Sequence, residues 1–260
     1  MKSGNSKSKI IQINNQLFFE KSFPQNNQIQ FYNEYFIHNY LTNFSKMFTV
    51  PLVNKDSKNL KLLYQYMPNT KYLSKVHLIK YLNLIKSIHR STCNKNRNNL
   101  FAKEALINNN ICINQIKEKF KNHKQNKLSI DIEKEYKLFI EKLETFFLNR
   151  LVPHLEKINP KSSHVFSHAD SGIHNCVLDF NNELRLVDLE YSGFDSPIKQ
   201  HIDFLIHPRN LKGSEIFKDW SNYFVNEKIS KDDKPNLNIY NSLFSIKWSL
   251  IIISFSGTSI

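Results

Sequence analysis

The feature that most constrains this chain is a polar loop with a glycine in it, followed by a strand hairpin that ends on an aspartate. The loop reads S-H-A-D-S-G-I-H-N over residues 167–175, and the apolar runs C-V-L-D-F and L-R-L-V-D follow it around an Asn-Asn turn. Asp170 and Asn175 therefore share one loop, and Asp188 closes the second strand. Such a hairpin returns its second strand towards the loop, so we expect the three side chains to lie close together.

Residues 1–67 have the pattern of a small antiparallel sheet with one helix. Two short apolar runs flank an Asn-Asn pair at 14–15, which is typical of a tight hairpin turn. Apolar residues at helical spacing follow over 30–41, and two further apolar runs then predict two more strands. This part is predicted to form an N-terminal lobe.

Residues 68–260 have mainly helical patterns. An amphipathic segment covers 75–89, and long helices are predicted over 101–122 and 131–151. The segment 199–260 is again mainly helical, so that the loop and hairpin lie between helices. The predicted fold class is α+β, with a small antiparallel-sheet N-terminal lobe at 1–67 and a mainly helical C-terminal lobe.

Composition excludes several classes of protein. The three cysteines are odd in number and show no C-x-x-C spacing, which argues against a disulfide framework or a zinc site and favours a reducing cytoplasm. The N-terminus lacks the apolar core of a signal peptide. The most apolar run, W-S-L-I-I-I-S-F, is far shorter than the ~20 residues that span a bilayer. We therefore expect no membrane span.

The net charge of +13 allows a second reading. A strongly basic chain can bind an anionic partner, such as nucleic acid or nucleotide phosphates. The lysines are scattered and form no dense arm or stripe, so no nucleic-acid partner is expected. A basic nucleic-acid-binding protein remains the alternative from another class.

The order of the polar residues along the chain suits phosphoryl transfer from a nucleotide. Lys21 lies on a predicted strand, and Glu34 lies on the following helix, where it can hold the lysine in place. Downstream, Asp170 and Asn175 have the spacing D-x-x-x-x-N of a kinase catalytic loop, and Asp188 adds a second carboxylate. Such a reaction needs a cation at the phosphates, hard oxygen ligands for metal ions, and an aspartate for the acceptor hydroxyl.

The segment F-S-H-A-D-S-G-I-H-N-C-V-L-D-F-N-N-E-L-R-L-V-D-L-E-Y-S-G resembles the aminoglycoside phosphotransferase and choline kinase superfamily. Those enzymes carry H-G-D-L-H-x-x-N, then a hairpin and I-D-W/F-E-Y-A-G. A later stretch, D-S-P-I-K-Q-H-I-D-F-L-I-H-P, is similar to a pattern in a bacterial phosphotransferase subgroup. The resemblance implies the protein-kinase-like two-lobed fold, with ATP and Mg²⁺ as cofactors.

The resemblance also implies roles for individual residues. Asp170 would be the catalytic base, and Asn175 and Asp188 would hold Mg²⁺. Lys21 would contact the α and β phosphates, with Glu34 as its ion-pair partner.

Further residues match supporting positions. L-L-Y-Q-Y-M-P looks like the hinge that reads adenine, which places Gln65 and Met67 at the nucleotide. His168 would support the catalytic loop from below, and Asp203 would brace the loop from the next helix. Glu190 follows the metal aspartate and could face the metal or the acceptor.

The chain also departs from the family pattern. The loop expected to cover the phosphates holds the single glycine Gly4, and Ala169 and Ser171 stand where Gly and Leu are commoner. The absence of D-F-G and A-P-E segments argues against a protein kinase. The sequence predicts an ATP- and Mg²⁺-dependent kinase that phosphorylates a hydroxyl of a sugar, amino alcohol or aminoglycoside-like acceptor. A catalytically weak or inactive nucleotide-binding pseudokinase is the alternative on the same fold.

Overall fold

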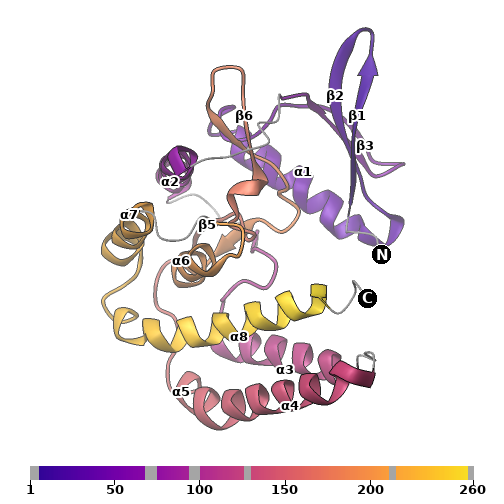
Figure 1. Cartoon of the computed structure of the whole chain (residues 1–260). Coiled ribbons are helices and arrows are strands. Elements are labelled where there is room, and N and C mark those ends of the chain that lie inside the picture. The colour runs from indigo at the N-terminus through magenta and orange to yellow at the C-terminus, as the bar shows by residue number, and fades with distance from the viewer. Residues whose placement is uncertain (1–5, 68–74, 94–99, 126–129, 211–214, 257–260) are drawn as a thin grey trace.

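The computed structural model describes residues 6–67, 75–93, 100–125, 130–210 and 215–256. A small sheet with one helix forms the N-terminal part, and layers of helices form the remainder (Figure 1). The N-terminal elements are β1 (Lys7–Ile13), β2 (Gln16–Ser22), α1 (Gln28–Thr42), β3 (Leu52–Asp56) and β4 (Lys61–Gln65).

The N-terminal sheet is antiparallel, with strand order β1-β2-β4-β3. The turn between β1 and β2 is formed by Asn14 and Asn15, both of which have left-handed backbones (φ 47° and 62°). Asparagine tolerates this conformation better than most residues, which explains why the Asn-Asn pair predicted the hairpin correctly. The predicted phosphate-covering loop at Gly4 and the boundary after residue 67 touch segments outside the described residues.

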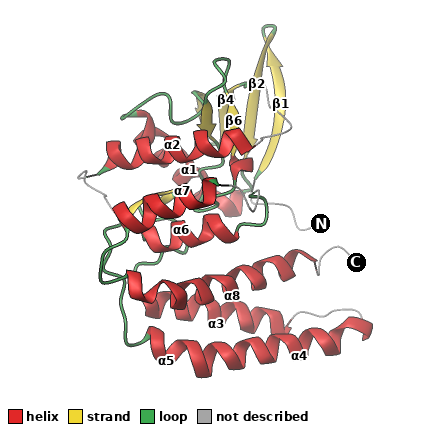
Figure 2. Cartoon of the chain, turned by 60° about the vertical axis from the view of Figure 1, so that its left-hand side comes forward, coloured by secondary structure: helices red, strands yellow, loops and turns green. Residues whose placement is uncertain are grey.

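The C-terminal part is mainly helical, as predicted. Its helices are α2 (Lys75–Thr92), α3 (Asn109–Gln125), α4 (Ile130–Phe146), α5 (Val152–Leu155), α6 (Pro197–Ile206), α7 (Ile216–Tyr223) and α8 (Leu237–Ser256). Its strands are β5 (Val165–Ser167), β6 (Cys176–Leu178), β7 (Leu184–Leu186) and β8 (Gly193–Asp195). Helices α8, α3 and α4 form a layer beneath α6 and α7 (Figure 2).

The sheet between β5 and β8 was missed in the sequence, and it corrects the predicted helix over 101–122. Helix α3 begins at Asn109, because the segment before it is extended along β8. The amide of Ala102 donates to the carbonyl of Phe194, and the amide of Phe194 donates to that of Leu100. A β-carbon at Gly193 would lie 2.6 Å from the Ala102 nitrogen, so the glycine permits this close approach.

Two buried apolar clusters hold the molecule together. The smaller one fills the space between the N-terminal sheet and α1, and its residues are Phe23, Phe31, Val50, Leu60, Leu62, Tyr64 and Met67. The larger one runs through the helical part and also includes Ile37, Leu41 and Phe48. Because α1 contributes to both clusters, the two predicted lobes are packed onto each other through this helix.

The hairpin β6–β7 is fastened to the N-terminal part by main-chain and side-chain bonds. The amide of Leu186 donates to the carbonyl of Phe48. Arg185 is buried, pairs with Asp179 across the hairpin, and donates to the Lys46 carbonyl at 2.7 Å. The hairpin end that carries Asp188 is therefore held against the sheet that carries Lys21.

The structure also bears on the disulfide framework and the membrane span that the composition argued against. Cys93, Cys112 and Cys176 form no disulfide. Among the described residues, no helix combines the length and apolar character that crossing a bilayer needs.

Candidate active site

Lys21 lies at the centre of a buried group of charges. It projects from β2 with a side chain that is only 5% exposed, and its ammonium forms an ion pair with Glu34 on α1. Its Nζ also lies 2.5 Å from Asp188 Oδ1 and 3.2 Å from Glu190 Oε2. Burial by itself would lower the pKa of Lys21, but the three carboxylates outweigh it and hold that pKa above its usual range. The lysine is therefore a permanent cation.

Glu34 is fixed from both sides. One carboxylate oxygen pairs with Lys21, and the other accepts a hydrogen bond of 2.8 Å from the hydroxyl of Tyr64 on β4. The sequence did not single out Tyr64, although its place one residue before Gln65 on the predicted hinge strand was visible. A carboxylate with both oxygens occupied keeps the lysine in one position.

Asn175 and Asp188 lie at the same open end of the hairpin. Cys176 pairs with Leu186 in the β6–β7 register, and the amide of Val187 donates to the carbonyl of Asn175. The Asn175 side chain donates its amide hydrogen to the Asp170 carbonyl at 3.1 Å, which leaves its Oδ1 for a ligand. The Asp188 carboxylate is 47% exposed. These are hard oxygen donors of the kind that Mg²⁺ prefers.

A cavity of about 310 Å³ connects these groups. It lies between the N-terminal sheet and the β6–β7 hairpin. Six of the site residues predicted from the sequence line it: Lys21, Glu34, Gln65, Met67, Asn175 and Asp188. Apolar side chains, including Ile10, Val50 and Leu186, form its walls. A charged end and an apolar end together suit a ligand that has both phosphates and a flat ring.

His168 connects the loop at 167–175 to the segment that precedes Asp188. This imidazole is fully buried, and burial lowers its pKa, so it is neutral. Its Nε2 donates to the Val187 carbonyl at 2.7 Å, and its own carbonyl accepts from the Ser192 hydroxyl at 3.1 Å. Ala169, the next residue, has a left-handed backbone with φ 62°. That conformation suits glycine, which is commoner at this position in the family that the motif resembles.

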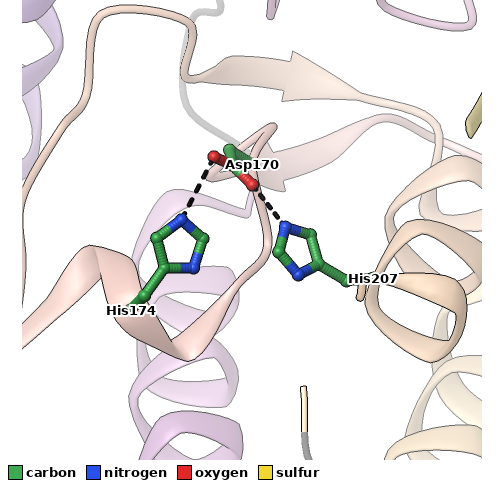
Figure 3. A group of neighbouring side chains, drawn as sticks. All are labelled: Asp170, His174 and His207. Carbon is green, nitrogen blue, oxygen red and sulfur yellow. Dashed lines mark hydrogen bonds and ion pairs between the residues drawn. The ribbon is translucent and has the colours of Figure 1, made fainter. Parts of the chain in front are cut away.

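Asp170 follows Ala169 and lies between two histidines (Figure 3). Its Oδ1 is 2.7 Å from His207 Nε2, and its Oδ2 is 3.5 Å from His174 Nε2. Burial raises the pKa of Asp170, but the hydrogen bonds from the two histidines outweigh it and hold that pKa well below its usual range. His207 was missed, because it comes from the end of α6, 37 residues downstream.

Asp203 was expected to brace the loop at 167–175 from the next helix, and its carboxylate makes its hydrogen bonds between two helices. It pairs with Lys199 at 2.6 Å and accepts from the Trp248 indole at 2.9 Å, so it joins α6 to α8. The direct hydrogen bonds to the loop come from Asn210. Its Oδ1 accepts from the Ile173 amide, and its Nδ2 donates to the Ser171 carbonyl. A carboxylate could not do both, since it lacks a donor.

Glu190 faces the lysine. Its carboxylate is 6% exposed and, with Glu34 and Asp188, forms a group of three carboxylates close enough to share one cation. Its backbone is fixed as well, because Asn33 on α1 donates to the Glu190 carbonyl at 2.8 Å. Glu190 therefore lies beside Lys21 and Asp188, and its predicted place at the metal or at the acceptor stays a prediction.

Comparison with known proteins identifies the fold. No protein-family model matches the chain, and no curated protein matches it by sequence. Among solved structures, choline kinase LicA from Streptococcus pneumoniae matches with a TM-score of 0.62 and 15% identity, covering 97% of this chain and 83% of that one. The gentamicin complex of APH(2")-IIa matches with a TM-score of 0.64 and 17% identity, covering 100% and 85%.

A third solved structure is similar in the same way. It is the ternary complex of aminoglycoside phosphotransferase APH(4)-Ia with ADP and hygromycin B, with a TM-score of 0.62 and 12% identity, covering 99% of this chain and 87% of that one. These likenesses confirm the predicted protein-kinase-like fold. The fold is shared with the choline kinase and aminoglycoside phosphotransferase structures, the group of proteins that the loop and hairpin motif resembles.

Proposed function

We propose that this protein is a small-molecule kinase that transfers the γ-phosphoryl group of ATP to a hydroxyl group. One observation carries the proposal: a single cavity brings together Lys21, Asn175 and Asp188, and Asp170 lies in the loop that begins this site. These residue types are the parts that phosphoryl transfer needs, which supports the proposal. Choline and aminoglycosides, the acceptors of the similar structures, define the class to be screened first.

Each residue would have a distinct task in this reaction. Lys21, held by Glu34, would bind the phosphates and offset their charge. The backbone of the segment at Gln65 and Met67 would face the adenine ring, since both residues line the cavity. Asp170 would orient the acceptor hydroxyl and take its proton.

The residues present fit Mg²⁺. Asp188 offers a half-exposed carboxylate, and Asn175 offers a carbonyl oxygen whose partner amide is already engaged. When bound there, Mg²⁺ would offset the negative charge on the phosphates during transfer. Asp188 is paired with Lys21, so phosphates would compete with this carboxylate for the lysine.

A thermal-shift experiment tests the nucleotide site. The midpoint of unfolding would be measured with and without millimolar Mg-ATP for the wild type, for Asp188→Ala, and for the control Asp232→Ala. Asp232 is 64% exposed and pairs with Lys161, away from the cavity. A ligand that binds only the folded state at a hundredfold excess over Kd adds about 2.7 kcal/mol of stability. We expect a Mg²⁺-dependent rise in the wild type and in the control, and none in Asp188→Ala.

Two results would count against the proposal. An unchanged midpoint in the wild type would mean that the cavity does not bind Mg-ATP, and the basic surface would become the better lead. A rise that persists in Asp188→Ala would place the nucleotide elsewhere. A screen of ATP consumption with hydroxyl acceptors then separates a kinase from a pseudokinase, which would bind nucleotide without turnover.

A further inference from the structure

The carboxylate of Asp170 has two oxygens in different surroundings. Oδ1 is 2.7 Å from Nε2 of His207, whose side chain is only 4% exposed. Within the described part of the chain, Oδ2 makes the longer contact of 3.5 Å to His174 Nε2, and the Asp170 side chain is 43% exposed. We propose that His207 is a positioning residue, which holds Oδ1 of Asp170 and thereby reserves Oδ2 for the acceptor hydroxyl. The inference rests on the proposed function, because it assigns a task within that same site.

The hydrogen bonds of His207 determine where its proton lies. Its Nδ1 is 3.1 Å from the backbone amide of Arg209, which can only donate. Nδ1 therefore accepts, and it carries no proton. The proton of the neutral ring is on Nε2, so His207 donates to Asp170 Oδ1. A donor fixed in this way selects one orientation of the carboxylate, since only Oδ1 can meet it.

The ring of His207 is itself held in place. Trp248 from α8 packs edge-on against it, with ring centroids 4.9 Å apart, and the His174 ring stacks on it at 5.2 Å. Trp248 in turn donates to Asp203, which joins α8 to α6. The contact on Asp170 thus depends on a rigid connection between two helices, rather than on a mobile surface side chain.

Gly172 makes room for the arrangement. A β-carbon at this position would lie 2.2 Å from His174 Nδ1 and 2.6 Å from His207 Cε1, distances that atoms cannot keep. The two histidines can therefore flank Asp170 only because residue 172 has no side chain (Figure 3).

A metal ion is the rival occupant of this cluster. One atom each of Asp170, His174 and His207 lie within 4.8 Å of one another, which is close enough for a shared ion. A metal on Nε2 of His207 would move the ring proton to Nδ1, where it would face the Arg209 amide hydrogen. Two donors would then point at each other, and the Arg209 bond would be lost. The Arg209 amide therefore favours the hydrogen bond between His207 and Asp170 over a metal site at these residues.

Paired substitutions test the proposal with the acceptor found by the screen. Histidine at 207 would be changed to Leu, which cannot donate, and to Gln, whose amide can donate from a similar position. His201 lies on the same helix, is equally buried at 6% exposure, and stacks on Phe224 away from Asp170. His201→Leu and His201→Gln are therefore matched controls for the effects of changing a buried histidine.

We expect His207→Leu to lower kcat by about 10- to 100-fold, the loss typical of a hydrogen bond to a charged group. The Mg-ATP thermal shift should be unchanged, and His207→Gln should recover most of the turnover. Wild-type kcat in His207→Leu, or equal losses in the Leu and Gln variants, would overturn the inference. If Mg-ATP causes no thermal shift in the wild type, the proposed function itself would be overturned instead.

A second measurement does not depend on turnover. Nitrogen-15 NMR of the histidine side chains distinguishes a proton on Nε2 from one on Nδ1. We expect the Nε2–H form for the resonance that disappears in His207→Gln. An Nδ1–H form would contradict the hydrogen bond between His207 and Asp170. Stoichiometric binding of Zn²⁺ that is lost in both His174→Gln and His207→Gln would contradict it also, and would assign a metal site.

Discussion

Lys21 and Asp188 are 167 positions apart in the chain, yet the lysine Nζ lies 2.5 Å from the aspartate Oδ1. The contact joins the N-terminal sheet to the end of the β6–β7 hairpin. It also brings the proposed phosphate-binding cation and the proposed metal ligand into one place. We therefore expect the stability of the protein and its affinity for Mg-ATP to depend on the same pair.

Lys21→Met should destabilise the protein as well as weaken nucleotide binding. The substitution leaves Glu34, Glu190 and Asp188 without their cation, and breaking a buried pair from one side costs about 3–5 kcal/mol. Urea unfolding would measure the loss. Lys9→Met is the control, because Lys9 is 64% exposed on β1 and should change stability by less than about 0.5 kcal/mol. Adding Glu34→Gln to Lys21→Met should restore part of the stability, and a further loss would contradict this explanation.

Asp170→Asn should separate binding from transfer. The amide still offers an oxygen to His207, so the loop should keep its shape, but it cannot take a proton from the acceptor. We expect turnover to fall by about 10²- to 10⁴-fold, while the Mg-ATP thermal shift is retained. A steady-state assay beside the thermal shift checks both. Full turnover in Asp170→Asn would show that another group is the base.

Ala169→Gly should stabilise the fold. Ala169 has φ 62°, a conformation that costs an L-residue roughly 1 kcal/mol and glycine almost nothing. Part of this gain is offset by the greater freedom of glycine in the unfolded chain, so we expect the thermal midpoint to rise by about 2–4 °C at most. Ala105→Gly is the control, since Ala105 is buried outside the left-handed region and should lose stability. A lower midpoint for Ala169→Gly would contradict the backbone assignment.

Glu104 should contribute to the free energy of unfolding, and this contribution should be lost at acid pH. It pairs with Lys119 of α3 at 3.1 Å and Lys247 of α8 at 2.7 Å, which connects the segment before α3 to both helices. Burial alone would raise its pKa, but the two lysines lower the pKa of Glu104 from 4.5 to about 2. In the unfolded chain the carboxylate takes a proton near pH 4.5, so the contribution is complete above that pH and is lost as the pH falls towards 2.

The measurement is the free energy of unfolding against pH for the wild type and for Glu104→Gln. The two curves should run parallel above pH 5.5 and converge between about 4.5 and 2. Glu118→Gln is the control, because Glu118 is 67% exposed and has only a surface pair with Lys121. If the wild type and Glu104→Gln stay parallel into the acid range, the two lysines do not determine the pKa.

The sequence predicted the parts of the site that depend on local pattern. Asn14 and Asn15 predicted their hairpin because few residues accept two left-handed conformations in succession. The loop and hairpin motif predicted the fold because its spacing and turn chemistry occur together in one family. The strands β5 and β8 are only three residues long, and so short a run has no detectable period of its own.

Contacts between segments that lie far apart in the chain could not be predicted from the sequence. His207 and Asn210 reach the catalytic loop only because α6 packs beneath it, and neither forms a pattern with Asp170 along the chain. Asp203 was assigned the bracing role from its place in a motif, but its side chain meets Lys199 on the same helix, four residues earlier. A motif gives the position of a residue along a helix. The group that its side chain contacts depends on how that helix is rotated within the fold.

The bond from the Leu186 amide to the Phe48 carbonyl has a consequence for motion. It makes the hairpin that carries Asp188 part of the same hydrogen-bonded unit as the chain leaving α1, the helix that carries Glu34. Local opening of either segment would break this bond, so the two should exchange their protected amide hydrogens together, as one cooperative unit. The residues proposed to hold the metal and the lysine would then leave or keep their folded positions together. A partly opened molecule would bind no nucleotide.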